Sequence, residues 1–254
     1  MGKLLFSKSE ISNWISGGKN NMSNPKNPPN ILLGSHDPLL ELAVKQSKSG
    51  IAMSFDGSTE GLERFKLNHG IASGLHIYDS DLESWNVPIV KKCLEKQDFV
   101  LMEWAKRDRG LIYKPKEKSE KKSINEFLGQ RFVTRQSGSG SDNYFKYICK
   151  RENINSSDFI STEVTYSEND AVSLILSDKA DVTLGLASEA KKHQLGFLHI
   201  ATERFDIVVN RISWFEKPFQ RLLNFSRSDD FLNTASNFFG YNINDLGTVH
   251  FNNK

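Results

Sequence analysis

The feature that most constrains this chain is a regular alternation of short apolar segments with amphipathic ones. Strand-like runs at 31–35, 51–57 and 71–79 each lead into a helix-like run, and a second series begins near residue 123. Strands that alternate with helices predict a parallel sheet with helices on its faces. The expected fold class is therefore α/β.

Two long extended segments divide the alternation into two halves. They lie near Val100–Tyr113 and Phe197–Val209. We expect residues 31–110 together with 205–254 to form lobe 1, and residues 111–204 to form lobe 2. Two lobes joined by two crossing strands make a hinged cleft, and ligands of open α/β sheets bind beyond the carboxyl ends of the strands.

Composition and charge exclude several classes of protein. The 254 residues carry a net charge of +2, so no global field favours nucleic acid or a membrane surface. No apolar run approaches the roughly 18 residues that span a bilayer, and the first residues lack the apolar core of a signal peptide. Cys93 and Cys149 stand in separate amphipathic segments and are expected to be reduced. We expect a cytoplasmic protein without a membrane partner.

Small hydroxyl residues follow two of the expected strands in lobe 1. Ser35 and His36 belong to "GSHD", and Ser58 and Thr59 belong to "DGST". Serine hydroxyls and the first N–H groups of a helix suit an anionic ligand. A simpler interpretation is that Asp37, Ser58 and Thr59 cap helices. Asp37 would repel an anion, so we expect it to bond to the backbone.

The segment "RQSGSGSD" supplies the second half of the expected clamp. Its candidate ligand-binding residues are Arg135, Ser137, Ser139 and Ser141. Arginine offers a planar fork that matches an oxyanion, and the glycines allow the backbone to approach a ligand closely. In the alternative, Arg135 pairs with an acid across the hinge, Glu203 or Asp206.

His76 stands at a strand end, where it either faces the cleft or is a satisfied core histidine. The chain has no G-x-S-x-G, H-E-x-x-H or C-x-x-C motif and no P-loop lysine. Its histidines lack metal-ligand spacing. We expect no catalysis, no cofactor and no metal site.

Five stretches in a fixed order carry a family resemblance. They are "GSHDPLLELA", "GSTEGLERFKLNHGIASGLHIYD", "RFVTRQSGSGSDNYF", "AVSLILSDKADVTLGLASEAKKHQLGFLHIATERFDIVV" and "FFGYN". From about Ile31 to Tyr241 the chain resembles the type II periplasmic-binding-protein-like (PBP-like) domain of excisionase- or helix-turn-helix-linked regulators that respond to molybdate or tungstate. The resemblance implies two hinged lobes with a ligand cleft between them.

The N-terminal stretch "KLLFSKSEISNWI" is similar to the last strand and helix of excisionase-like domains. We expect residues 1–18 to be the remnant of a helix-turn-helix segment and residues 19–30, rich in Gly, Asn and Pro, to be a linker. The resemblance implies a DNA partner reached through an attached or upstream helix-turn-helix domain, and it leaves a homodimer open.

The expected function is that of a cytoplasmic sensor domain of a transcriptional regulator, which closes on a small anion such as molybdate or tungstate. One alternative is an organic, pterin-like ligand, for which Phe55, Tyr78 or Trp85 would provide stacking. Another is an extracytoplasmic solute-binding protein of a transporter, against which the missing signal peptide argues.

Overall fold

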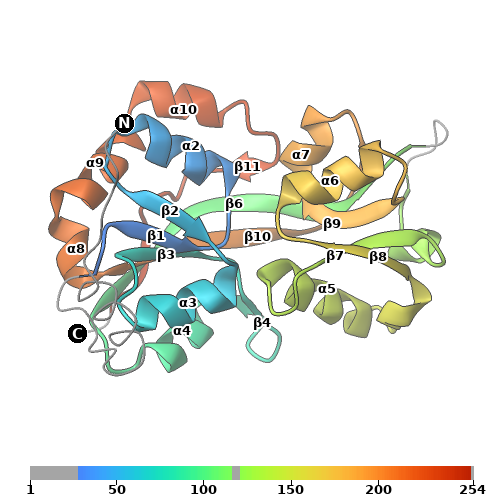
Figure 1. Cartoon of the computed structure of the whole chain (residues 1–254), viewed down its shortest axis with the longest axis horizontal. Helices are drawn as coiled ribbons and strands as arrows, with labels where there is room; N and C mark the ends of the chain where they lie inside the picture. Colours follow the sequence, from blue (N-terminus) through green and yellow to red (C-terminus); the bar gives the residue numbers. More distant parts are fainter. Residues whose placement is uncertain (1–27, 116–120, 253–254) are drawn as a thin grey trace, which may run out of the picture.

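Two long strands join two α/β lobes (Figure 1). The structure is a computed structural model that describes residues 28–115 and 121–252. The long strands are β6 (Phe99–Tyr113) and β10 (Gly196–Asn210), and they pair with each other antiparallel over their length. The expected helix-turn-helix remnant at 1–18 and most of the linker at 19–30 lie outside the described residues.

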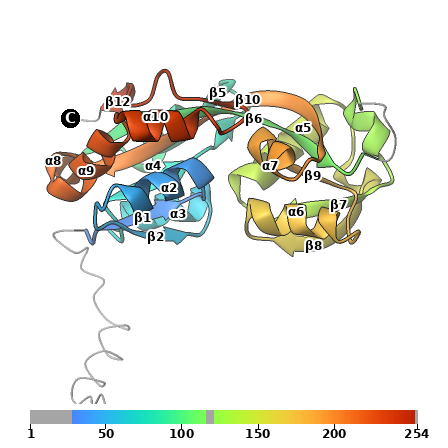
Figure 2. The ribbon, with the colours of Figure 1, turned by 90° about the horizontal axis from the view of Figure 1, so that it is seen from above.

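Lobe 1 contains three short parallel strands in the order β2-β1-β3, and β3 then pairs antiparallel with β10. These strands are β1 (Ile31–Gly34), β2 (Ala52–Phe55) and β3 (Ala72–Leu75). Because the three strands are parallel, their carboxyl ends all meet at the edge that faces lobe 2 (Figure 2).

Helices cover both faces of the lobe 1 sheet. One face packs against α2 (Pro38–Gln46), α9 (Lys217–Phe225) and α10 (Asp229–Ala235). The other packs against α3 (Ser58–Lys66) and α4 (Val87–Cys93). Buried leucine, isoleucine, valine and phenylalanine side chains fill both layers, so each helix buries one apolar stripe against the sheet.

Lobe 2 continues the same sheet in the order β6-β9-β7-β8. Its strands are β7 (Arg131–Arg135), β8 (Ile160–Thr165) and β9 (Val182–Leu186). Helix α5 (Gly140–Arg151) covers one face, and α6 (Glu168–Leu176) and α7 (Ala187–Lys192) cover the other. A short 3-10 turn, η1 (Ile124–Phe127), precedes β7.

The C-terminal part returns to lobe 1, as the sequence predicts. It forms α8 (Arg211–Phe215), α9 and α10. Two short strands that the sequence analysis did not predict, β11 (Tyr241–Asn242) and β12 (Val249–Asn252), pair with β6. A small hairpin, β4 (Tyr78–Asp79) with β5 (Ser84–Trp85), extends from lobe 1 beside α5.

The predicted α/β class and the two crossing strands are confirmed. The expected lobe boundaries, 110/111 and 204/205, fall inside β6 and β10, so the hinge consists of paired backbone rather than loop. Within the described part of the chain, no helix is both long and apolar enough to cross a membrane. Cys93 and Cys149 are free thiols, as expected.

Candidate functional site

A cleft lies between the lobes, at the carboxyl ends of their parallel strands. It contains about 360 Å³ of empty space, its open mouth included. The part of this space that the centres of water-sized molecules can reach is about 20 Å³, so the cleft is small in this arrangement. Lobe 1 contributes Ser35, His36, Phe55, Gly57 and His76. Lobe 2 contributes Arg135, Gln136, Ser139, Ser141, Tyr166 and Glu168.

The two serines expected in lobe 1 lie in direct contact. The hydroxyls of Ser35 and Ser58 are 2.7 Å apart, and both residues are buried. Ser58 Oγ also accepts a hydrogen bond from the backbone N–H of His76. The N-cap interpretation of Ser58 and Thr59 is wrong, because α3 begins at Ser58 and Gly57 holds the cap position with a φ of 98° that favours glycine.

Thr59 does not line the cleft but connects the two lobes. Its hydroxyl donates to the backbone carbonyl of Gly138 at 2.8 Å. Nearby, the Cα of Gly140 packs so closely on His76 that an added Cβ would lie 2.6 Å from the His76 Cε1. These contacts show the lobes in a closed arrangement.

His36 lines the cleft with one ring nitrogen engaged. Its Nε2 lies 2.7 Å from the Glu41 carboxylate, so Nε2 carries a proton. Its Nδ1 is buried and has no partner among the described residues. Asp37, next along the chain, caps α2 through the N–H of Leu40 and does not line the cleft, as predicted.

In lobe 2, Ser139 and Ser141 line the cleft, but Ser137 is exposed and does not. Ser139 is the N-cap of α5, with its Oγ accepting from the N–H of Asp142. Ser141 Oγ accepts from Arg109 Nη1 at 3.0 Å. Because each oxygen already accepts a protein hydrogen bond, each hydroxyl hydrogen is left to donate to a ligand.

Arg135 lines the cleft but has a partner that the sequence analysis did not name. Its Nη1 lies 3.2 Å from Glu168 Oε1, and its Nε and Nη2 donate to the carbonyls of Thr165 and Tyr166. The alternative pairing with Glu203 or Asp206 is therefore wrong. Both of those acids are occupied by other groups, Glu203 by Arg107 and Arg109 and Asp206 by Arg204.

A buried ion-pair network adjoins the cleft, and Glu168 is the member of this network that lines the cleft. Arg107 bridges Asp37 and Glu203, and Arg109 bridges Glu203 and Glu168. All five side chains are at most 8% exposed. Burial alone would raise the pKa of Glu203, but Arg107 and Arg109 outweigh it and hold that pKa well below its ordinary value. The network ties both crossing strands to both lobes.

His76 joins this network through a 3.1 Å contact between its Nδ1 and Glu203 Oε2. Burial lowers the pKa of His76 even though the Glu203 carboxylate acts in the opposite direction. His76 is thus both a cleft-lining residue and a hydrogen-bonded core histidine, which combines the two interpretations that the sequence left open.

Two of the three aromatic side chains predicted to stack on an organic ligand lie outside this cleft, although Tyr166 lines it. Of the three predicted stacking residues, Phe55 lines it, whereas Tyr78 and Trp85 do not. Those two pack instead against Tyr144 and Tyr147 of α5, with ring centroids 4.7–5.4 Å apart. This aromatic cluster is a second contact between the lobes.

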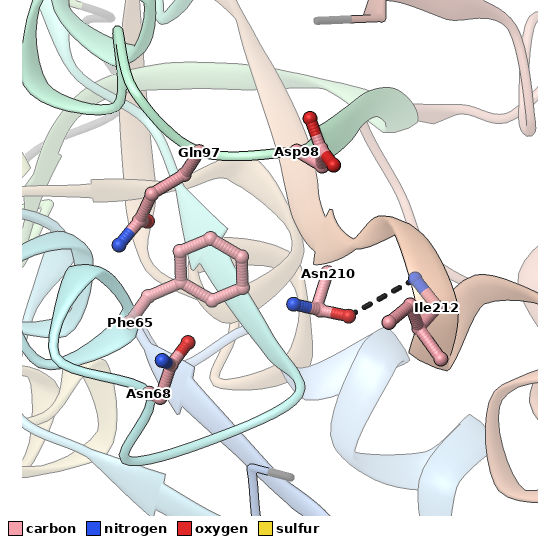
Figure 3. A pocket seen from close by; sticks show the side chains of 6 residues that line it. All are labelled: Phe65, Asn68, Gln97, Asp98, Asn210 and Ile212. Atoms are coloured by element: carbon pink, nitrogen blue, oxygen red, sulfur yellow. Dashed lines mark hydrogen bonds between the residues drawn. The ribbon is translucent and has the colours of Figure 1, made fainter. Parts of the chain in front are cut away.

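A second hollow lies at the far edge of the lobe 1 sheet (Figure 3). Its lining residues are Phe65, Asn68, Gln97, Asp98, Asn210 and Ile212. Asn210 serves as the N-cap of α8 by accepting from the N–H of Ile212 and Ser213. None of the six lining side chains is basic, so this hollow is a poorer match for an anion than the cleft.

Sequence reasoning missed the buried ion-pair network that adjoins the cleft. Arg107 and Arg109 stand two residues apart and share one face of β6, and Glu203 is the register partner of Arg107 on β10. The i, i+2 spacing of the two arginines within an apolar strand was the available signal. Among the described residues, no group of His, Cys, Asp and Glu is arranged to hold a metal ion.

Comparison with known proteins places this arrangement among ligand-binding proteins. A curated relative, the uncharacterized protein YvgK of Bacillus subtilis, is 24% identical over 237 residues, which is 89% of this chain and 75% of the relative.

Solved structures with the same fold include a phosphate ABC transporter substrate-binding protein of Clostridium perfringens with bound phosphate. It is 12% identical, with a TM-score of 0.58 over 81% of this chain and 96% of its own. The CcmR regulatory domain of Synechocystis in complex with 2-PG is 11% identical, with a TM-score of 0.55 over 77% and 93% of the two chains. These likenesses concern the fold.

A family model described as the PBP superfamily domain matches residues 39–227, which include both crossing strands and most of both lobes. The chain therefore belongs to the PBP superfamily domain family and is a PBP-like small-ligand-binding domain.

Proposed function

We propose that this domain is the cytoplasmic sensor of a transcriptional regulator and that it closes on a tetrahedral oxyanion. The observation that carries the proposal is the convergence of hydroxyl groups from both lobes on one small cleft. The Ser35–Ser58 pair approaches from lobe 1, and Ser139 and Ser141 approach from lobe 2.

Helix ends add further donors to these hydroxyls. The first N–H groups of α5, after Ser139, have no acceptor within the helix, and the same holds for α3 after Gly57. Both helices begin at the cleft, so their dipoles favour negative charge there. Neutral donors that converge in this way can hold an anion without a surplus of buried cations.

Two lines of support bear on which oxyanion the cleft binds. The sequence resemblance implies molybdate or tungstate, and a protein with the same fold holds phosphate. The small cleft and its single predicted aromatic wall favour such compact ligands over a pterin. The role in a regulator rests on the sequence resemblance, and the CcmR regulatory domain offers a precedent for the fold.

A thermal-shift screen of the purified chain tests the proposal. It includes molybdate, tungstate, phosphate, sulfate and a set of organic acids and pterins. A ligand at about 100 times its Kd stabilises the folded state by roughly 2.7 kcal/mol, which raises the melting temperature visibly. A shift with an oxyanion supports the proposal, and a shift with organic compounds alone contradicts it. A gel-shift assay with the chain and an N-terminally extended version tests the DNA partner.

A further inference from the structure

The two oxygens of the Glu168 carboxylate are in unequal environments. Oε1 receives contacts of 3.2 Å from Arg109 and from Arg135. Oε2 is buried and has no hydrogen-bond partner among the described residues. Glu168 is 6% exposed and lines the cleft, so the unused acceptor belongs to a residue of the ligand site.

The carboxyl group of Glu168 is ionised. Burial alone would raise its pKa, but the guanidinium groups of Arg109 and Arg135 outweigh burial and lower that pKa. A buried carboxylate oxygen that accepts no hydrogen bond is unfavourable. Because the ionised Glu168 carries no proton that could be moved, Oε2 can be satisfied only by a donor from another group. A donor from a bound ligand would satisfy it.

A second unpartnered polar atom lies on the opposite wall. His36 Nε2 donates to Glu41, and His36 Nδ1 is buried without a partner among the described residues, so Nδ1 accepts from a ligand when the ring is neutral and donates to one when the ring is protonated. Gln136 contributes an unpartnered Oε1, although its amide can rotate to present an N–H group instead. The cleft thus offers hydroxyl donors, the buried Arg135 Nη1, which donates no hydrogen bond to a described residue, and one fixed acceptor, Glu168 Oε2.

The charges around the ligand space are balanced. Three guanidinium groups face three carboxylates in the connected network of Arg107, Arg109, Arg135, Asp37, Glu203 and Glu168. No surplus positive charge in this network offsets the repulsion between Glu168 and a fully deprotonated dianion. An oxyanion that keeps a proton turns this repulsion into a hydrogen bond.

We infer that Glu168 makes the cleft selective for oxyanions that retain a proton, such as hydrogen phosphate or hydrogen arsenate, over sulfate, molybdate and tungstate. The ligand hydroxyl donates to Glu168 Oε2, while its other oxygens accept from the hydroxyls of Ser139 and Ser141. The inference rests on the proposed function, because it concerns the ligand of the same cleft.

Calorimetric titration of the full chain with phosphate, sulfate and molybdate at neutral pH tests this inference. Wild type should bind phosphate roughly ten- to hundredfold more tightly than sulfate, the span expected for one hydrogen bond to a charged group. Glu168→Gln offers an N–H group to a deprotonated oxyanion, so it should narrow the phosphate-to-sulfate ratio by at least tenfold.

Glu189→Gln is the matched control. Glu189 is a lobe 2 carboxylate of similar burial that does not line the cleft, so its removal changes the charge without touching the ligand. It should leave the phosphate-to-sulfate ratio at the wild-type value. The wild-type titrations decide the matter by themselves if Glu168→Gln fails to fold.

The outcomes separate the two proposals. Wild type that binds sulfate or molybdate as tightly as phosphate overturns the selectivity and leaves the oxyanion function standing. An unchanged phosphate-to-sulfate affinity ratio in Glu168→Gln also overturns the selectivity and leaves the oxyanion function standing. Binding of no oxyanion by wild type overturns the proposed function and the selectivity with it.

Discussion

The hydroxyl of Thr59 in lobe 1 donates a 2.8 Å hydrogen bond to the backbone carbonyl of Gly138 in lobe 2. The two residues are 79 positions apart and stand at the rim of the cleft, where α3 begins and the loop before α5 turns. Because the bond spans the two lobes, separation of the lobes would break it. It links the ligand-holding turns of both lobes directly, so closure and ligand binding should depend on each other.

Thr59→Val should weaken ligand binding without affecting the fold. The change keeps the side-chain shape but removes a bond worth about 1 kcal/mol, so Kd should rise about fivefold. Thr234→Val, which removes a similar 2.8 Å bond to the Asp230 carbonyl within α10, is the control. Calorimetric titration of both variants measures the effect, and equal affinities would mean that the Thr59 bond does not couple to the ligand.

Gly140→Ala should hold the lobes apart. Its Cβ would lie 2.6 Å from both the Cε1 and the carbonyl oxygen of His76, and overpacking of this kind costs roughly 1–3 kcal/mol. We expect at least a tenfold loss of affinity, and a larger radius of gyration in small-angle scattering because the lobes relieve the overlap by separating. Wild-type affinity in this variant would show that closure is not needed for binding.

Arg107→Met should destabilise the whole domain. It leaves the carboxylates of Asp37 and Glu203 without their shared partner, and breaking a buried ion pair in this way costs roughly 3–5 kcal/mol. Arg131→Met removes a partly exposed pair with Asp181, which solvent screens, so it should cost far less. Urea denaturation gives both values, and similar losses in the two variants would contradict the importance of the buried network.

His76 should make the stability depend on pH in a defined direction. Its pKa in the folded state lies below the ordinary value of 6.5, so the unfolded chain takes up the proton first. The contribution of His76 to the free energy of unfolding is therefore fully present above pH 6.5. It is lost as the pH falls below 6.5, by up to roughly 1.4 kcal/mol per pH unit. Asp206 acts in the opposite direction, because burial raises its pKa to about 6.

The comparison of wild type with His76→Gln isolates the histidine, since both proteins contain Asp206. The wild-type free energy of unfolding should fall relative to that of the variant as the pH decreases from 7 to 5. A constant difference between the two curves would show that His76 titrates alike in the folded and unfolded chains.

Much of the fold could be predicted because local patterns report it directly. Asp37 followed by Pro38 marks the start of α2, and the structure shows that cap with the expected bond to the N–H of Leu40. The long apolar runs identified β6 and β10 because no helix-type spacing competes with them. The short strands β11 and β12 could not be predicted, since two to four residues carry no periodicity.

The site was less predictable because it depends on distant pairings. From the sequence alone, Arg107 and Arg109 would be expected to face solvent, because charged residues are rarely fully buried unless they are paired. Their burial becomes evident only once the register places Glu203 opposite Arg107. The partner of Arg135 is Glu168, at the start of α6, and no spacing along the sequence connects the two.

The most direct measurement is calorimetric titration of wild type and of Ser35→Ala/Ser139→Ala with the oxyanion that gives the largest thermal shift. Loss of the Ser139 cap should lower the stability of the ligand-free variant by about 1 kcal/mol, which leaves it folded. We predict that wild type binds one oxyanion per chain and that the double variant binds it at least tenfold more weakly. Equal affinity in the two proteins would show that the cleft between the lobes does not hold the ligand.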